Sequence, residues 1–433
     1  MRNRKGSATV LLSMVAVSLS MAILSAILVM RQIAIGSTVE SYGRIWTTAV
    51  LSEYDRNLFR DYGIMAFYGN NPEMSEKVQY YLDYSLKGVL GIRSPKANAE
   101  LNGYEMSDVE NFRNALVKSF GQEALESILK KSKRTTRPDS TEKDSGEKKK
   151  PREIRNPVVL RTLPSRDAED STNIEKLTEL FKEGKYTNDA GVSLKSITAE
   201  TVFIRKHFGS ALKIADKKKH YFQNEWEYII KGAPNDETNL KSCRRRLFLV
   251  RNGLNLAYLY SDSGKVELVT SLAEIISPGP MGLVTQGILM EAWAALEAKQ
   301  DVEDLLQGER VPVMKTEKTW KTSIQGILND GEMKKKLDED SQKMLEEKNA
   351  EVQEAAGGSI QKKVSEGLTY EDYLWVLILA MPKDTRTLRI MDLVQINMKY
   401  RYYRDFNLAE YYGGVDVTIN AGRKKHSFHK EYQ

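Results

Sequence analysis

The stretch ATVLLSMVAVSLSMAILSAILVM, residues 8–30, runs for 23 residues without a charged side chain. A helix rises about 1.5 Å per residue, so a helix of this length can cross a hydrocarbon layer of about 30 Å. The stretch lacks the polar face that a buried helix of a globular domain usually carries. The sequence therefore predicts a single transmembrane helix, with the bulk of the chain on one side of a membrane.

The flanking charges predict the orientation of this helix. Arg2, Arg4, Lys5 and the terminal amine precede it, whereas the 15 residues that follow it contain two cations, Arg31 and Arg44, and one acid. Lys and Arg next to a span are retained on the cytoplasmic side. We therefore expect residues 1–7 to form a cytoplasmic basic arm and the chain after residue 30 to be extracytoplasmic, at the cell membrane.

A cleaved secretory signal is the main alternative for this stretch. The apolar core of such a signal is usually about 7–15 residues, which is shorter than the stretch observed, although cleavage near Leu24-Ser25-Ala26 fits the chemistry of signal peptides.

Small side chains recur within the span at every fourth residue. Ser18, Ala22 and Ala26 share one helical face, and small residues at this spacing let two membrane helices approach closely. They are candidate residues for packing against a partner helix or a second copy, although Ser and Ala are also common fillers in membrane spans.

Composition excludes several classes of protein. The net charge of +6 is concentrated in the N-terminal arm and in residues 131–153, which hold nine Lys/Arg and five Asp/Glu. The rest of the chain is near neutral, so nucleic acid is not an expected partner. The single cysteine, Cys243, excludes an internal disulfide, and we interpret it as a semi-buried helix residue despite the three arginines that follow it.

The apolar pattern predicts an α+β fold that is predominantly helical, with a few short strands. Residues 31–130 form a membrane-proximal stalk and a helical region with short strands, and residues 131–153 form a disordered charged linker, since they contain no apolar side chain. Residues 154–433 form a mainly helical domain with a C-terminal strand and a polar tail. Helices are expected at 39–50, where Val39, Trp46 and Val50 recur at helical spacing, at 71–87, at 108–131 with a break near Gly121, and at 174–182, 199–217, 240–260, 282–306, 334–363, 370–381 and 385–403. Gly63 is a candidate helix C-cap, residues 64–68 form a short strand or a buried segment, and residues 415–419 form a strand.

The sequence contains no recognisable catalytic motif. It has no phosphate-binding loop, dinucleotide fingerprint, nucleophile elbow or zinc-protease helix. His426 and His429 could place two imidazoles on one helical face for a metal, but they lie in a polar tail and we interpret them as solvated. Most of the carboxylates lie in charge-mixed helices and are expected on solvated faces, so none is assigned to acid–base chemistry. We therefore predict no enzyme, no cofactor and no metal.

The N-terminus resembles the start of TadE/TadG-like pseudopilins of tight-adherence (Tad) pili. Lys5-Gly6-Ser7-Ala8-Thr9-Val10 followed by a long apolar helix matches the pattern in which a peptidase cuts after a Gly that follows basic residues. The resemblance implies processing between Gly6 and Ser7. The family carries a Glu five residues after the cut, whereas this chain has Leu11.

Much of the remaining chain resembles an uncharacterised domain family found beside Tad-type pilus genes in Gram-positive bacteria. The segments that carry this resemblance are residues 51–63, 225–232, 246–255, 292–297, 308–315 and 367–374. It implies a genomic neighbourhood and a place at the cell surface rather than a mechanism.

Three functions are compatible with these patterns. The first is a structural or assembly component of a Tad-like, type IV-related pilus or secretion apparatus, with other apparatus proteins as partners. The second is a membrane-tethered surface binding module unrelated to a pilus, and the third, which the lack of motifs disfavours, is an ectoenzyme.

Overall fold

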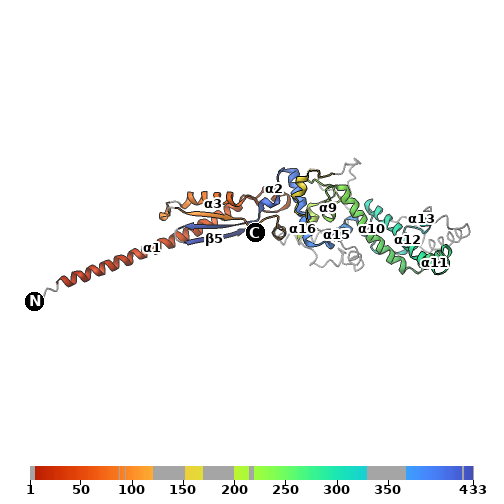
Figure 1. Ribbon diagram of the computed structural model, residues 1–433, viewed down its shortest axis with the longest axis horizontal. Coiled ribbons are helices and arrows are strands. Elements are labelled where there is room, and N and C mark those ends of the chain that lie inside the picture. The colour runs from red at the N-terminus through yellow and green to blue at the C-terminus, as the bar shows by residue number, and fades with distance from the viewer. Residues whose placement is uncertain are drawn as a thin grey trace. The chain divides into compact units, whose positions relative to one another are not determined.

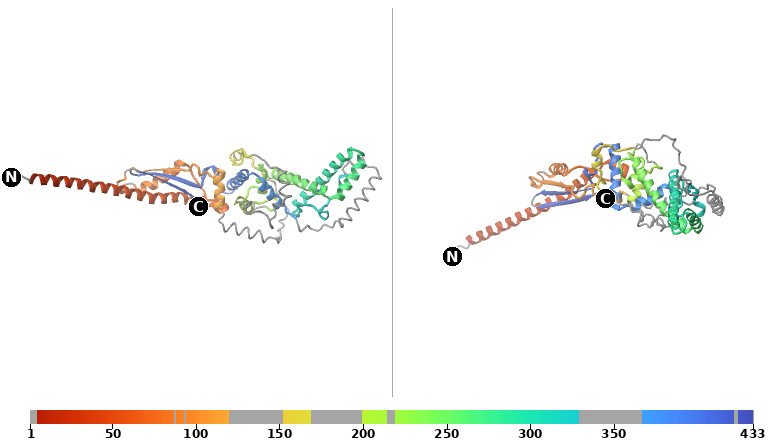
Figure 2. Two further views of the ribbon diagram at one scale, coloured as in Figure 1. Left: turned by 90° about the horizontal axis from the view of Figure 1, so that it is seen from below. Right: turned by 45° about the vertical axis from the view of Figure 1, so that its right-hand side comes forward.

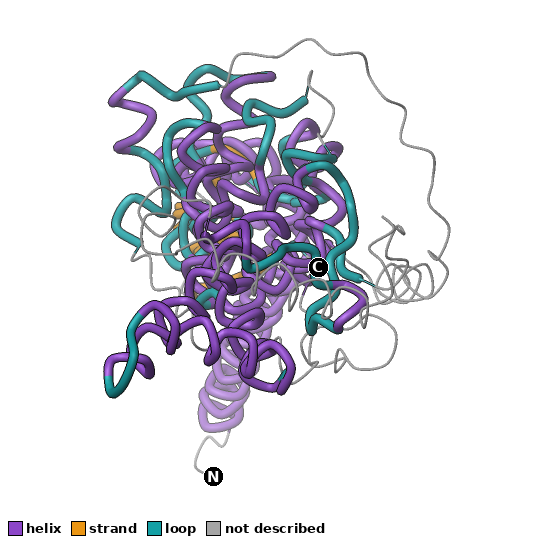
Figure 3. The backbone as a smooth tube through the Cα atoms, turned by 90° about the vertical axis from the view of Figure 1, so that its right-hand side faces the viewer, coloured by secondary structure: helices purple, strands orange, loops and turns teal. Residues whose placement is uncertain are grey.

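A computed structural model describes residues 5–86, 88–92, 94–119, 152–168, 199–213, 219–328, 367–421 and 424–432. The chain divides into two compact units. Unit 1 comprises Met1–Ser119 and Asn407–Gln433, and unit 2 comprises Phe120–Phe406. Figure 3 shows many helices and few strands, so the predicted predominantly helical α+β class is confirmed.

Unit 1 begins with one long helix, α1 (Lys5–Leu51), which runs without interruption from the apolar stretch into the amphipathic one. The remaining elements of unit 1 are α2 (Arg56–Tyr62), β1 (Phe67–Tyr68), α3 (Asn71–Leu86), η1 (Val89–Gly91), β2 (Lys96–Glu100), α4 (Val109–Ser119), η5 (Leu408–Glu410), β3 (Tyr411–Tyr412), β4 (Gly414–Ala421) and β5 (Lys424–Glu431). Both views of Figure 2 show the first half of α1 projecting beyond the strands of this unit.

An antiparallel sheet in the order β2-β4-β5 forms the centre of unit 1, and β1 pairs with β3 in a separate two-stranded ladder. Lys96 lies opposite Asn420, and Asp416 lies opposite His429. The second half of α1 packs against β4 and β5, and α3 packs against β2. The core consists of apolar side chains from these elements, among them Val39, Val78 and Val417.

Helix α3 also covers the outer edge of the sheet. Three of its side chains, Asn71, Ser75 and Gln79, accept hydrogen bonds from the backbone N–H groups of Leu101, Ala99 and Ala97 at 2.8, 2.9 and 2.7 Å. These groups would otherwise be unpaired donors on an edge strand. The spacing of four residues in α3 matches alternate residues of β2, so one helix face satisfies the strand edge.

Unit 2 is helical in its described part. It contains α6 (Pro157–Arg161), α8 (Ala199–His207), α9 (Glu225–Lys231), α10 (Asp236–Ser261), α11 (Ser263–Ile276), α12 (Met281–Leu306), η3 (Glu317–Thr319), α13 (Gln325–Leu328), α15 (Tyr370–Ala380) and α16 (Lys383–Arg401). Helices α9, α15 and α16 pack together, and α10, α11 and α12 form a second bundle with its own apolar cluster (Figure 1).

Several predicted elements match these bounds closely, and others differ. The expected helices at 240–260, 282–306, 370–381 and 385–403 correspond to α10, α12, α15 and α16. The helix expected at 199–217 ends at His207, where Gly209 and Ser210 follow. The predicted helices at 174–182 and 334–363, and nearly all of the predicted linker at 131–153, lie outside the described residues.

The C-terminus differs from the expectation in two ways. The segment predicted as a polar tail is strand β5, which pairs with β4 along eight residues. Residues 407–433 belong to unit 1 rather than to the domain predicted at 154–433, since β4 pairs with β2. The pairing of β4 with β2 joins segments far apart in the sequence, so no local pattern predicts it. Strand β5, in contrast, follows β4 directly in the chain, with Ala421 opposite Lys424.

Candidate functional site

The first half of α1 exposes its apolar side chains on all sides. Leu12 is 73 % exposed, Leu19 60 % and Met30 69 %. Within the described residues this is the one helix long and apolar enough to cross a membrane. It has the length and composition of a membrane anchor or of a signal sequence.

The candidate packing residues Ser18, Ala22 and Ala26 all lie exposed on this half of α1. The hydroxyl of Ser18 donates to the carbonyl oxygen of Met14 at 2.8 Å, so it is satisfied within the helix and adds no unpaired polar group to the surface. Gly6 and Ser7, the candidate processing residues, belong to the first turns of α1, and their side chains lie outside the description.

The second half of α1 is the buried half. Ile35, Val39, Trp46 and Val50 recur at helical spacing and are at most 5 % exposed. A Cβ atom at Gly43 would lie 2.3 Å from the Phe428 ring of β5, so only glycine permits the present approach of helix and strand. One continuous helix thus joins an exposed apolar segment to the sheet of unit 1.

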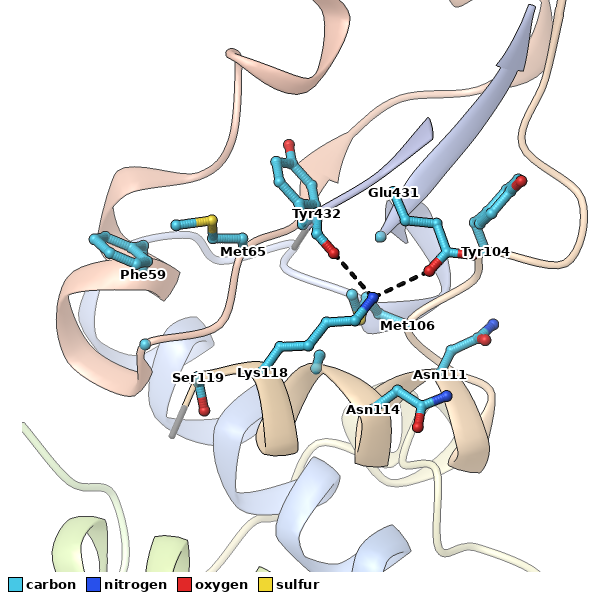
Figure 4. A pocket seen from close by; sticks show the side chains of 13 residues that line it. Phe59, Met65, Tyr104, Met106, Asn111, Asn114, Lys118, Ser119, Glu431 and Tyr432 are labelled. Carbon is cyan, nitrogen blue, oxygen red and sulfur yellow. Dashed lines mark hydrogen bonds and ion pairs between the residues drawn. The ribbon is translucent and has the colours of Figure 1, made fainter. Parts of the chain in front are cut away.

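A pocket of about 290 Å³ lies in unit 1 beside α4, near the end of β5 that carries Glu431 (Figure 4). Phe59, Met65 and Met106 supply its apolar lining, and two asparagines of α4 supply amide groups. The ammonium group of Lys118 donates to Glu431 Oε2 at 3.0 Å and to the carbonyl oxygen of Tyr432 at 2.9 Å. The cation of this mixed lining is therefore already paired within unit 1.

A polar cluster lies at the rim of this pocket. The Tyr104 hydroxyl donates to Asp416 Oδ1 at 2.8 Å, and His429 Nδ1 lies 2.5 Å from that hydroxyl and 2.8 Å from the same carboxylate oxygen. Burial, followed by the hydrogen bond to Asp416, raises the pKa of Tyr104 above its usual range. The phenol therefore stays protonated and acts as a donor.

The structure does not bring His426 and His429 together. Both lie on β5, where side chains three residues apart point to opposite faces of the strand. The His426 ring approaches Gly36 of α1, whereas His429 faces Tyr104. The hypothesis that the two imidazoles share one helical face is therefore wrong. No cluster of three or more potential metal ligands occurs among the residues that the structure describes.

Unit 2 contains a group of four buried charges that joins α10, α12 and the segment after α12. Arg251 Nε donates to Asp301 Oδ2 at 2.9 Å, and Lys315 Nζ lies 2.6 Å from Asp301 Oδ1 and 2.5 Å from Glu297 Oε1. Although burial opposes ionisation, Arg251 and Lys315 hold the pKa of Asp301 below its usual value. Both carboxylates and both cations are paired, so the group holds three segments together.

Two further buried carboxylates of unit 2 have raised pKa values. Burial raises the pKa of Glu227 on α9 to about 7, although the hydroxyl of Tyr370 donates to it at 2.8 Å. Burial raises the pKa of Asp392 on α16 to about 6, against hydrogen bonds from Ser165 and the positive charge of Arg389. Perturbed carboxyls mark functional sites in many proteins, but structural networks shift pKa values as well.

These buried groups are the residues that sequence reasoning missed. The expectation that carboxylates lie on solvated faces is wrong for Glu227, Glu297, Asp301 and Asp392, all of which are fully buried. Glu297 and Lys315 lie in segments that were singled out only by family resemblance, and helical spacing alone does not separate them from exposed charges. Cys243, in contrast, lies on a helix as predicted, although it is fully buried rather than semi-buried.

These observations define a mostly helical α+β protein with two compact units and a long, exposed apolar helix at its N-terminus. The chain belongs to a family of unknown function, DUF5702, which matches residues 149–422. No curated protein and no solved structure matches the chain significantly. The prediction of an uncharacterised domain is confirmed; the family match begins after α1 and extends through unit 2 into β3 and β4.

Proposed function

We propose that the protein is a membrane-anchored, extracytoplasmic structural or assembly component of a Tad-like pilus or secretion apparatus, related to the TadE/TadG-like pseudopilins. The observation that supports this is the division of α1. Its first half is exposed and apolar, and its second half packs on an antiparallel sheet in the same unit. A subunit of this design presents a rod for assembly and a folded head.

The exposed half of α1 requires a partner. Each Å² of apolar surface kept in water costs about 25 cal/mol, so Val10 to Met30 favour lipid or a bundle of similar helices. Ser18, Ala22 and Ala26 give such a bundle a face along which helices approach closely. Leu11 stands where the pseudopilins carry a Glu, whose carboxylate would be unfavourable in lipid. This helix therefore resides in a membrane more readily than one that carries the Glu.

The sequence of the mature N-terminus, taken from protein extracted from membranes, tests this proposal. A start at Ser7 identifies prepilin-type processing and a pilin-like subunit. A start at Met1 identifies a permanent anchor and favours an assembly factor. A start near Ile27 means a cleaved secretory signal and contradicts the proposal.

Disulfide cross-linking within membranes tests the helix face. We expect Ala22→Cys to give cross-linked products and Leu24→Cys, about 200° around the helix, to give none. Cys243 is buried and does not interfere. Equal cross-linking by both variants, or by neither, argues against a specific face.

A second function, a tethered surface binding module, is favoured by the pocket beside Lys118. Affinity capture from cross-linked membranes separates the two. Recovery of pilin or Tad-platform proteins supports the first function. Recovery of a specific glycan or surface protein without them, lost in Lys118→Met, supports the second.

A further inference from the structure

The two ends of the sheet in unit 1 differ in charge. Strand β2 begins with Lys96 and ends with Glu100, and β5 begins with Lys424 and ends with Glu431. The strand register places both lysines at one end, since Lys96 lies opposite Asn420 and Ala421 lies opposite Lys424. Both are exposed, as is Lys425. One end of the sheet is therefore basic.

The basic end is also the end from which α1 leaves unit 1. His426, next to Lys425, has its ring 3.7 Å from the Cβ position of Gly36, near the start of the buried half of α1. At the other end of the strand, Lys430 Nζ donates to Thr48 Oγ1 at 2.8 Å, close to the end of α1. Figure 1 shows the projecting part of α1 leaving the sheet on the side away from the C-terminus.

The η1 turn is held at the boundary between the two halves of α1. Arg31, the first charged residue after the apolar stretch, donates from Nη2 to the carbonyl oxygen of Gly91 at 3.1 Å. A Cβ at Gly91, whose φ is +69°, would lie 2.6 Å from that nitrogen, so glycine permits this contact. The turn therefore lies at the level where the apolar surface of α1 begins.

Aromatic and apolar side chains are exposed around this boundary. Tyr84, in the last turn of α3, is 86 % exposed, Tyr80 one turn earlier is 68 % exposed, and Val89 of η1 is 43 % exposed. Tyrosine combines an apolar ring with a hydroxyl and is enriched where hydrocarbon meets water. Of the nearby acids, Glu76 and Asp83 on α3 and Glu40 on α1 are exposed, and the four exposed cations outnumber them.

We propose that this end of unit 1 is a membrane-docking surface formed by Tyr80, Tyr84 and Val89 with Arg31, Lys96, Lys424 and Lys425. It contacts the headgroup layer of a bilayer that contains anionic lipid. The proposal rests on the membrane-anchor part of the proposed function, because α1 delivers the surface to the bilayer. Apolar contact combined with basic residues is the usual requirement for stable binding at a membrane surface.

Docking would fix the tilt of unit 1 relative to the membrane. A single helix alone leaves a folded head free to swing, whereas additional contacts from α3, η1 and the β4–β5 end restrain it. The pocket beside Lys118 lies at the other end of the sheet, with Glu431 and Tyr432, and would then face away from the bilayer.

Site-directed spin labelling of the full chain in vesicles tests the proposal. The label is placed at Val89→Cys, at Val117→Cys as a matched valine of α4 at the other end of unit 1, and at Leu19→Cys in the apolar stretch. Vesicles contain phosphatidylcholine alone or with anionic phosphatidylglycerol. The readout is the ratio of collision rates with oxygen, which enters lipid, and with a water-soluble nickel chelate.

We expect Leu19 to report the hydrocarbon core, Val89 the headgroup layer and Val117 water. The ratio at Val89 should exceed that at Val117 several-fold and should fall in Tyr84→Ser and in the double variant Lys424→Gln, Lys425→Gln. The lysine variant should matter only in anionic vesicles. The matched variant Tyr68→Ser, which removes an exposed tyrosine of β1, should leave the ratio unchanged.

Two results overturn the proposal, and they are distinguishable. If Leu19 is immersed but Val89 matches Val117 in both lipids, the docking surface is absent while the anchor stands. If Leu19 itself is exposed to water, the anchor is wrong and the docking surface fails with it.

Discussion

Units 1 and 2 differ in where they place their charges. The core of unit 1 is built from apolar side chains of α1, α3, β2 and β4. Each of its described ion pairs has at least one exposed partner, as in Lys118–Glu431 with side chains 40 % and 45 % exposed. In unit 2 the side chains of Arg251 and Asp301 are both fully buried and paired.

This difference predicts how each unit responds to substitution. Exposed pairs contribute little, because water and salt screen them. A buried pair also adds little net stability, but removal of one partner leaves an uncompensated charge in a low-dielectric interior. Unit 2 should therefore depend on individual charged residues, whereas unit 1 should depend on the summed apolar area.

The largest expected effect is at Asp301. Asp301→Ala leaves Arg251 and Lys315 buried with Glu297 as their only carboxylate in the group, and should destabilise unit 2 by about 3–5 kcal/mol. Hydrogen exchange of peptides from α10 and α12 measures this for unit 2 alone. The matched change in unit 1, Glu53→Ala, breaks the exposed pair with Lys77 and should cost about 1 kcal/mol or less. Similar losses in both variants would remove the distinction.

The second effect is a pH dependence confined to unit 2. The pKa of Glu227 is about 7 in the folded protein and near 4.5 in the unfolded chain. Between these two pH values the folded state therefore binds more protons than the unfolded state. Stability of unit 2 should therefore fall as pH rises from 4.5 to 7, by up to about 3 kcal/mol from this residue.

Glu227→Gln should flatten this slope, since glutamine has no proton to lose. The measurement is the free energy of unfolding of unit 2 across pH 4–8. A slope that is unchanged in Glu227→Gln would show that another group, with Asp392 the first candidate, causes it.

The third effect is the loss of stability on replacing each of two glycines that have a positive φ. Gly232, at the end of α9, has a φ of +70°, and its Cβ position lies 1.8 Å from the Arg389 guanidinium; Gly88 has a φ of +83° with no neighbour within 4 Å of its Cβ position. Gly232→Ala should cost about 2–3 kcal/mol and Gly88→Ala about 1 kcal/mol. Thermal unfolding of the two variants checks the ranking, and equal losses would mean that Arg389 moves aside freely.

The smallest effect is at Gly43. Gly43→Ala places a methyl group against the Phe428 ring, but alanine also favours the helix by about 1 kcal/mol, so a net loss of about 1 kcal/mol is expected. The protection of β5 peptides against hydrogen exchange measures this loss of stability. A gain in stability would show that Phe428 repacks without cost.

Local signals in the sequence were sufficient for much of this fold. The apolar stretch and the buried face at Val39, Trp46 and Val50 predict α1, and Gly63 predicts the end of α2, where it adopts a φ of +70°. Alternation after Gly414 predicts β4. These signals depend on residues that are neighbours in the chain, so propensity and periodicity reveal them.

The features that escaped prediction depend on distant partners. Nothing near Ser75 or Gln79 indicates that they accept hydrogen bonds from β2, and nothing near His429 indicates that it lies beside Tyr104. Glu297 and Asp301 have the spacing of exposed helix charges, and only Arg251 and Lys315 from other segments reveal their burial. The candidate residues in α1 remain predictions, because their partners would come from another molecule.

Unit 1 is built from two segments that lie far apart in the sequence, and this has a consequence for biosynthesis. Tyr104 and His429 touch although 325 residues separate them, so β2 and α3 emerge from the ribosome long before β4 and β5 complete their sheet. Closing a long loop costs entropy that rises with its length, and a folded unit 2 shortens the flexible part of that loop. The nascent chain should therefore complete unit 2 first, while the apolar faces of α1 and α3 wait uncovered. Those faces therefore stay uncovered during translation until the last strands arrive.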